Sequence, residues 1–298
     1  MLARHFLARA PGFLLWGAMA VFSAGCASRP EAPIIELPGG AAAATTAVRL
    51  TALLPADVLL IGEQHTAAAH QQIEQQVIAI LAARGLLAAL ALEMADAGVS
   101  TAALMPSATE LQVRQALQWD DKGWPWKAYG PAVMAAVRAG VPVLGANLPR
   151  AQMPGRMADR TLDVQLPGPA LKAQQQLVRI GHCNLLPESQ ITPMVRVQVA
   201  RDIIMANMLS QTVLPGKVVV LLTGSVHADR RLGVPQHLPS DIKVKAVHLR
   251  AGAGADNEAA DAFDSVWPTP AVPETDDCAD LRKQFPPASK PGSAPAPN

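Results

Sequence analysis

The chain has little charge and few aromatic residues. Charged residues make up 16% of its 298 residues, aromatic residues make up 4%, and the formal net charge at pH 7 is +1. Proteins that bind nucleic acids carry basic stripes or aromatic platforms, and neither pattern is present. Half of the residues (50%) are hydrophobic, which is enough to build a buried core. The composition argues against a nucleic-acid partner and predicts a globular protein.

The first 25 residues predict an export signal. An apolar segment, residues 10–22, follows two arginines and is too short for a typical membrane span. It leads into Ser23-Ala24-Gly25-Cys26, which resembles the lipobox of bacterial lipoproteins, with Cys26 as the lipidated first residue of the mature chain. Ala27 is typical of lipoproteins sorted to the outer membrane, so we expect a lipid anchor there, on the periplasmic face. An ordinary cleaved signal peptide is the alternative.

Cysteine is scarce, and its positions are informative. Besides Cys26, only Cys183 and Cys278 are present. An even number of cysteines in an exported chain predicts a disulfide between them. Two separate thiols are the alternative. Because His182 precedes Cys183, this pair could also be metal ligands or a thiol–imidazole nucleophile.

Composition divides the chain into segments. Residues 26–47 are rich in Pro, Ala and Gly and predict a flexible tether, and residues 286–298 predict a disordered tail. The segment between them, residues 48–285, has a length that suits one α/β domain.

Apolar runs alternate with helical patterns along this domain. The runs predict strands that end near residues 61, 92, 146 and 222, and the helical patterns cover residues 66–84, 131–139, 171–180 and 188–209. Such alternation predicts an α/β fold with a mostly parallel central sheet flanked by helices. The stretch 151–210 lacks a convincing strand, so we expect a helical insertion over the carboxyl edge of the strands.

Polar residues follow these predicted strands. His65, Glu93, Asn147 and His227 each stand at a strand end, and Glu63 shares the turn with His65. Open parallel sheets bind ligands beyond the carboxyl ends of their strands, so we expect a site there. Two imidazoles with carboxylates could hold a divalent metal or form a metal-free acid–base pair. Each histidine could also simply cap a turn.

Two further groups of residues are candidates. Gln198 and Arg201 share one face of the longest predicted helix with methionines. Buried polar groups are costly unless they are paired, so this face lines a polar pocket or meets solvent. Tyr129, the only tyrosine, lies in a tryptophan-rich segment, residues 119–129. This segment is a hydrophobic core or the wall of a pocket for a flat ligand, and a phenolate can ligate haem iron.

Seven segments, taken in order, resemble one family. They are Ile61-Gly62-Glu63-Gln64-His65, Ala91-Leu92-Glu93-Met94, residues 123–129, residues 145–150, residues 182–188, residues 198–206 and residues 224–235. Together they resemble the ChaN family of iron-regulated, haem-binding lipoproteins, part of a superfamily with erythromycin esterases and Tiki-type peptidases. The similarity spans residues 57–238 and continues to Cys278.

The resemblance implies a haem pocket, often at a homodimer interface where two haems lie face to face, and a role in iron or haem acquisition at the envelope. It makes Tyr129 the leading iron ligand. The other implied haem contacts are Glu63, His65, Asn147, Arg150, His182, Gln198, Arg201 and His227.

The superfamily also leaves two other functions open. Relatives hydrolyse esters or peptides with the same strand-end residues. The alternative is therefore a hydrolase with His65 as base, Glu93 orienting it and His227 sharing a metal. A non-catalytic interaction protein with a vestigial pocket is a third possibility.

Overall fold

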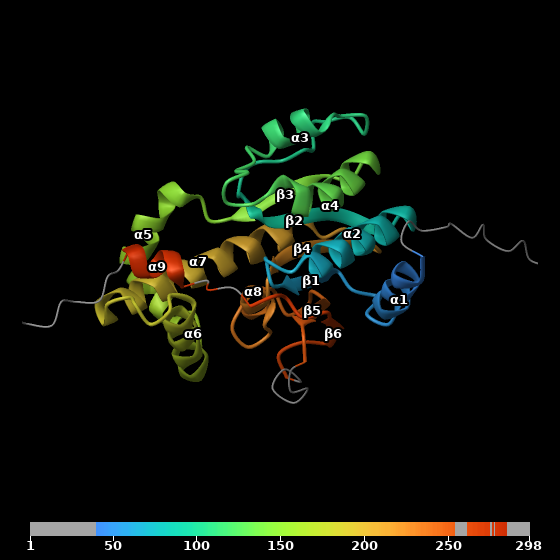
Figure 1. Ribbon diagram of the computed structural model, residues 1–298. Helices are drawn as coiled ribbons and strands as arrows, with labels where there is room; N and C mark the ends of the chain where they lie inside the picture. Colours follow the sequence, from blue (N-terminus) through green and yellow to red (C-terminus); the bar gives the residue numbers. More distant parts are fainter. Residues whose placement is uncertain (1–39, 254–260, 275, 277, 285–298) are drawn as a thin grey trace, which may run out of the picture. The chain divides into compact units, whose positions relative to one another are not determined.

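The computed structural model describes residues 40–253, 261–274, 276 and 278–284. A six-stranded sheet in the order β3-β2-β4-β1-β5-β6 lies at its centre (Figure 1). All neighbouring strands are parallel. The strands are β1 (Val58–Glu63), β2 (Leu87–Asp96), β3 (Val143–Asn147), β4 (Val218–Gly224), β5 (Val244–Ala251) and β6 (Ser265–Thr269). The predicted α/β fold is confirmed, and β5 and β6 extend the sheet beyond the four predicted strands.

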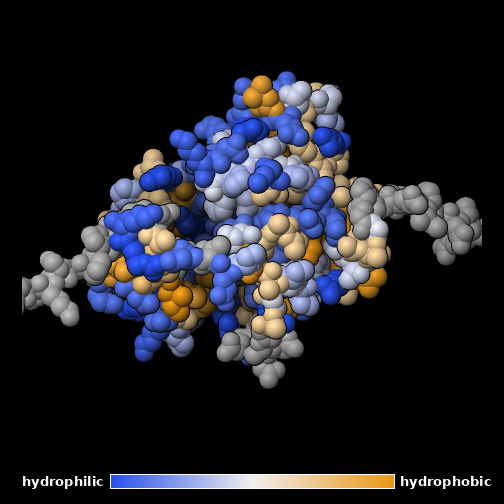
Figure 2. Space-filling view, viewed as in Figure 1, coloured by the Kyte–Doolittle hydropathy of each residue, from blue (hydrophilic) through white to orange (hydrophobic). Residues whose placement is uncertain are grey.

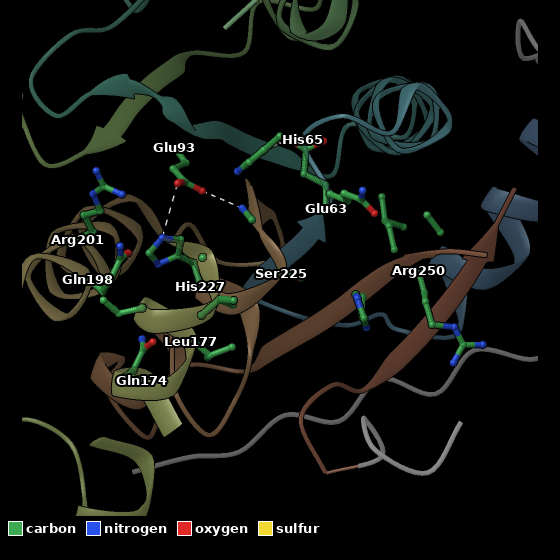
Figure 3. A pocket seen from close by; sticks show the side chains of 18 of the residues that line it. Glu63, His65, Glu93, Gln174, Leu177, Gln198, Arg201, Ser225, His227 and Arg250 are labelled. Atoms are coloured by element: carbon green, nitrogen blue, oxygen red, sulfur yellow. Dashed lines mark hydrogen bonds and ion pairs between the residues drawn. The ribbon is translucent and has the colours of Figure 1, made fainter. Parts of the chain in front are cut away.

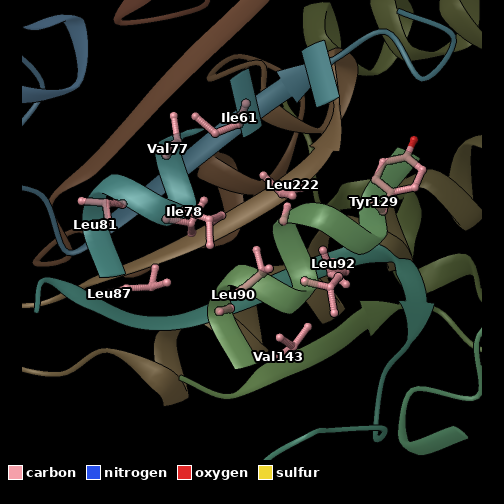
Figure 4. Packing of buried hydrophobic residues seen from close by; sticks show 14 of the residues in the cluster. Ile61, Val77, Ile78, Leu81, Leu87, Leu90, Leu92, Tyr129, Val143 and Leu222 are labelled. Carbon is pink, nitrogen blue, oxygen red and sulfur yellow. The ribbon is translucent and has the colours of Figure 1, made fainter. Parts of the chain in front are cut away.

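Alternate residues of the central strands build two separate cores. Side chains along a strand point to opposite faces in turn, and β1 is buried along its whole length. Leu59 and Ile61 pack with α2 (Ala68–Ala83) and α4 (Trp126–Arg138), as Figure 4 shows for Ile61. Val58 and Leu60 pack on the other face with α7 (Glu188–Thr212). Helices therefore cover both faces of the sheet.

The helical insertion is present between β3 and β4. It contains two short 3-10 helices (Arg150–Gln152 and Arg160–Val164), α5 (Met153–Ala158), α6 (Gly168–Gly181) and α7. It has a hydrophobic core of its own. The Arg196 guanidinium fixes its loops, because Nε and Nη2 each donate to Asp163 at 2.7 Å and Nη1 donates to the Met157 carbonyl at 2.9 Å. The insertion is thus a folded unit that stands beside the strand ends.

The tether prediction is wrong at its carboxyl end. Residues 40–47 belong to α1 (Gly40–Thr51), in which Ala43, Thr46 and Leu50 are buried. The Thr46 hydroxyl donates to Gln76 of α2 at 2.6 Å. An alanine-rich segment has high helix propensity, and here its apolar face packs on α2. Residues 26–39, the export signal with Cys26, and the tail 286–298 lie outside the described residues.

The remaining helices are short. They are α3 (Glu110–Ala116), α8 (Ser225–Ala228), a 3-10 helix (Val234–His237) and α9 (Ala279–Gln284). The predicted helix 131–139 begins earlier, at Trp126, which places Pro131 in its second turn. No described helix has both the length and the apolar composition needed to cross a membrane. The face shown in Figure 2 is mainly hydrophilic. Within the described ranges, the large exposed hydrophobic residues are Val48, Met105, Leu111, Val164, Ile180 and Leu214.

The predicted disulfide between Cys183 and Cys278 is confirmed. Cys183 follows the end of α6, and Cys278 immediately precedes α9. The bond therefore fastens the C-terminal segment to the corner between α6 and α7.

Removing this bond is expected to destabilise the protein. The two cysteines are 95 residues apart, and the chain-entropy model assigns such a loop about 4–5 kcal/mol of unfolding free energy. Guanidinium denaturation of the Cys183→Ser/Cys278→Ser variant should show a loss of up to that size. The wild type in reductant is the matched control and should coincide with the variant. Free alkylation of both thiols in the native protein without reductant would contradict the prediction.

Candidate functional site

A cavity of about 630 Å³ lies where the parallel strands end. Its walls come from the ends of β1, β2, β4 and β5 on one side and from α6 and α7 on the other (Figure 3). The polar residues that line it are Glu63, Gln64, His65, Glu93, Gln174, His182, Gln198, Arg201, Ser225, His227, His248 and Arg250. Ligand pockets commonly measure 300–1,000 Å³, so the cavity can accept a sizeable organic molecule.

Close backbone packing brings the ends of β1 and β4 together. A Cβ atom added at Gly62 would lie 2.9 Å from both the Ala228 Cβ and the Ser225 Cα. A Cβ added at Gly224 would lie 3.1 Å from Nε2 of His65. Real Cβ atoms do not tolerate the first separation, so only glycine at position 62 lets the turn that carries His227 pack directly on the turn that carries His65.

Glu63 organises one side of the cavity. Its Oε1 accepts hydrogen bonds from Nδ1 of His65 and from the Tyr129 hydroxyl, both at 2.8 Å, and its Oε2 accepts one from Gln71 at 2.7 Å. A carboxylate only accepts, so Nδ1 of His65 carries a proton and Nε2 points into the cavity toward Glu93 (Figure 3). Burial lowers the pKa of His65, but the bond to Glu63 and the charges of Glu93 and Glu63 outweigh it, and the pKa lies above its usual value.

Tyr129 stands behind Glu63 rather than among the residues that line the cavity. It is 1% exposed. Burial and the negative charge of Glu63 raise the pKa of its phenol far above the usual value. The hydroxyl therefore stays protonated and donates a hydrogen bond to Glu63. Glu74 is also fully buried here, and burial together with the Glu63 charge raises its pKa well above the usual range.

His227 occupies the centre of a second cluster. Its Nδ1 donates to Oδ1 of Asp202 at 2.6 Å, and its Nε2 lies 3.6 Å from Oε1 of Glu93. The other Glu93 oxygen accepts from the Thr223 hydroxyl at 2.6 Å and from the Gly224 amide at 2.8 Å. Glu93 therefore pairs with His227 and the end of β4, while Glu63 is the carboxylate that orients His65. This corrects the expectation that Glu93 orients His65.

The charges in this cluster are mutually dependent. Burial raises the pKa of Glu93, but the charges of His227 and His65 and two hydrogen bonds bring it down to about 2. Burial lowers the pKa of His227, but Asp202 and Glu93 raise it to about 9. Burial raises the pKa of Asp202 to about 6. The raised pKa favours the imidazolium form of His227, which lies between two carboxylates.

The structure brings most of the predicted site residues to the cavity. Gln198, Arg201 and His182 line it together with the strand-end histidines. Nδ1 of His182 bonds the Val178 carbonyl at 2.8 Å, and the disulfide removes Cys183 as a nucleophile. Asn147 and Arg150 do not line the cavity, because β3 is an edge strand separated from β4 by β2.

The tryptophan-rich segment belongs mainly to the core. Trp126 and Tyr129 are buried in the cluster between the sheet, α2 and α4, and Trp119 and Trp124 pack against it. The ring of Trp124 nevertheless meets the His65 ring edge to face at 4.8 Å between centroids. The segment thus supports His65 from behind rather than forming the cavity wall.

Sequence reasoning missed several residues of the site, among them Asp202, Thr223 and Gln174. A signal existed for Asp202, because a buried carboxylate on an apolar helix face requires a partner. Nothing in the sequence marks Thr223 or Gln174 as a site residue. Their places in the site result from the way that separate helices and strands pack together. Among the described residues, no group of three or more His, Cys, Asp or Glu side chains is arranged to hold a metal ion.

Comparison with known proteins identifies the family. The family model described as "Haem-binding uptake, Tiki superfamily, ChaN" matches residues 50–238. The chain therefore belongs to this family of haem-binding uptake proteins. No curated protein matches the chain.

Two solved structures are similar. ChaN of Campylobacter jejuni, described as binding haem cofacially, superposes with a TM-score of 0.62 and 26% identity over 74% of this chain and 89% of its own. The type III effector HopBA1 has a TM-score of 0.43 and 16% identity over 74% of this chain and 93% of its own, a similarity too low to bear on function.

The buried cluster is expected to make stability depend on pH through His227. Its folded pKa of about 9 exceeds the unfolded value of 6.5. Its stabilising contribution is therefore complete below pH 6.5 and is lost as pH rises through 9. Urea denaturation between pH 6 and pH 9.5 should show this fall for the wild type and not for His227→Gln, which should also be less stable at pH 6. His237→Gln is the matched control and should lose stability with rising pH as the wild type does. An equal fall in all three proteins would exclude His227 as its cause.

Proposed function

We propose that the protein is an exported, lipid-anchored protein that binds haem in the strand-end cavity and serves in iron or haem acquisition. Membership of the haem-binding uptake family supports haem as the ligand. The similar Campylobacter protein, described as binding haem cofacially, supports it as well. The observation in the site that carries the proposal is an imidazole nitrogen, Nε2 of His65, directed into a cavity of about 630 Å³.

The residues around the cavity fit a haem. Leu177, Val178, Val226 and Leu249 provide apolar wall for a flat ring, and imidazole and guanidinium groups lie at its edges. The donor set also suits the iron, since protein histidine and tyrosine side chains both ligate haem iron. When bound, the haem supplies the iron that is the cargo of uptake, and the chain holds and orients it.

We propose His65 as the iron ligand contributed by this chain. Glu63 fixes the imidazole through Nδ1, so in the neutral ring Nε2 carries the lone pair and is directed at the cavity. Tyr129, the ligand expected from the sequence, donates its hydroxyl to Glu63 instead and would have to leave that bond to reach the cavity. Tyr129 stays a prediction, and the two ligands can be told apart by their spectra.

Titration of the full chain with haemin, followed by absorption spectroscopy, tests both points. Saturable binding is expected. His65→Ala should change the spectrum of the complex, because it removes the imidazole nitrogen, whereas Tyr129→Phe keeps the ring's packing and should leave the spectrum nearly unchanged. Thr66→Ala, at an exposed neighbour of His65 that does not line the cavity, is the matched control for the turn.

Two results would contradict the proposal. A spectrum typical of a phenolate-bound, high-spin centre that disappears in Tyr129→Phe would identify Tyr129, and not His65, as the iron ligand. Absence of saturable haemin binding by the wild type would reject haem as the ligand of the cavity.

Anchoring in the membrane rests on the sequence of the export signal. If Cys26 is lipidated, the protein should fractionate with outer membranes, and Cys26→Ser should release it into the soluble periplasmic fraction. Ala27→Ser, which keeps the cysteine, is the control. Release of the wild type into the soluble fraction would favour an ordinary cleaved signal peptide.

Homodimerisation belongs to the same proposal. The family resemblance implies that two haems lie face to face between two copies of the chain. Sedimentation of the full chain with and without haemin tests this directly, since a monomer at saturation would exclude the arrangement.

A further inference from the structure

Three side chains on the insertion side of the cavity have hydrogen-bonding groups without partners among the described residues. Gln174 of α6 is 0% exposed, and neither its amide nitrogen nor its amide oxygen has a hydrogen bond. Nε of Arg201 on α7 is buried and unbonded as well. Gln198 lies one turn before Arg201 on the same helix. Figure 3 shows the three on the insertion side, across the cavity from Glu63 and His65. We call them the α6–α7 donor group.

Leaving the buried groups of Gln174 and Arg201 without partners is costly. An unsatisfied buried polar group costs roughly 1–3 kcal/mol, and more if it is charged. The carboxylates nearest to Arg201 do not meet this need. Asp202 is bonded to His227 through Oδ1, and Asp96 is exposed at the end of β2. No ion pair joins Arg201 to either of them within the described part of the chain. An arrangement of this kind is maintained when a ligand supplies the missing partner.

The chemistry of the group specifies that partner. A guanidinium presents several N–H donors that match the geometry of a carboxylate, and two primary amides add further donors beside it. The His227 imidazolium offsets one of the two negative charges of Asp202 and Glu93 nearby, and the Arg201 guanidinium itself carries a positive charge. The group therefore suits a negatively charged oxygen acid on a ligand whose body packs against Leu177 and Val178.

We infer that Gln174, Gln198 and Arg201 bind the carboxylate side chains of a porphyrin, so that the cavity selects the free acid and orients it with its carboxylates against the insertion and its ring toward His65. This inference rests on the proposed function, since it assigns a part of the same ligand to a part of the same cavity. Gln174, which no sequence signal marked, becomes a specificity-determining residue.

Esterification of the ligand provides the test. The full chain is titrated with haemin and with haemin dimethyl ester, in the same low concentration of detergent. Metal-free protoporphyrin IX and its dimethyl ester are titrated in parallel by fluorescence, which gives a readout that does not depend on iron. The wild type is expected to bind each free acid about tenfold or more tightly than its ester, the size expected for charge-assisted hydrogen bonds.

Variants assign this preference to the donor group. Arg201→Met and Gln174→Leu should each reduce the preference severalfold, because binding of the free acids weakens more than binding of the esters. Gln174→Leu should also leave the protein as stable as the wild type or more so, because it removes an unbonded buried amide. Gln176→Leu and Arg138→Met, at exposed positions of α6 and α4, are the matched controls and should keep the preference.

The outcomes separate this inference from the proposed function. Equal binding of acids and esters by the wild type would overturn the inference and leave haem binding standing. A preference that persists in both variants but disappears in Arg250→Gln would place the carboxylates at the β5 side of the cavity and also overturn it. Failure of every porphyrin to bind would overturn the proposed function itself.

Discussion

The buried imidazolium of His227 is the interaction on which the arrangement of the site depends. It joins Asp202, which belongs to the helical insertion, to Glu93, which belongs to the sheet. Removing one partner of a buried ion pair leaves an uncompensated charge and costs roughly 3–5 kcal/mol. The insertion and the sheet therefore share one electrostatic unit, and the cavity between them keeps its shape because this unit is complete. His65 is hydrogen-bonded to its own carboxylate, Glu63, and directs Nε2 into the cavity.

Much of the fold could be predicted because its signals are local. Continuous apolar runs gave the four strands β1 to β4, and the lack of such a run over residues 151–210 indicated the insertion. The order of strands in the sheet was not accessible in this way. Asn147 ends a strand just as His65 does, yet β3 lies at the sheet edge and its end is remote from β1. The alanine-rich residues 40–47 have tether-like composition but become helical by packing on α2.

The site was predictable to the same extent. Histidines and carboxylates at strand ends were found from sequence because parallel strands direct their ends to one edge. The sequence did not predict which carboxylate is hydrogen-bonded to which histidine, because this pairing depends on the direction of each side chain. Glu63, and not Glu93, is the carboxylate that is hydrogen-bonded to His65. The burial of Gln174 could not be predicted from the sequence for another reason. A glutamine on an amphipathic helix normally faces water, and only packing between α6 and α7 shows that this one does not.

The disulfide gives this architecture an order of assembly. Gly181 and His182 line the cavity, and Cys183 directly after them is bonded to Cys278. Disulfides form in oxidising compartments and are rare in the cytosol. The bond joins the corner after α6 to the C-terminal segment, in addition to the ion pair between Arg179 of α6 and Glu188 of α7. If the chain is exported as proposed, this covalent link beside the cavity wall therefore forms only after transport.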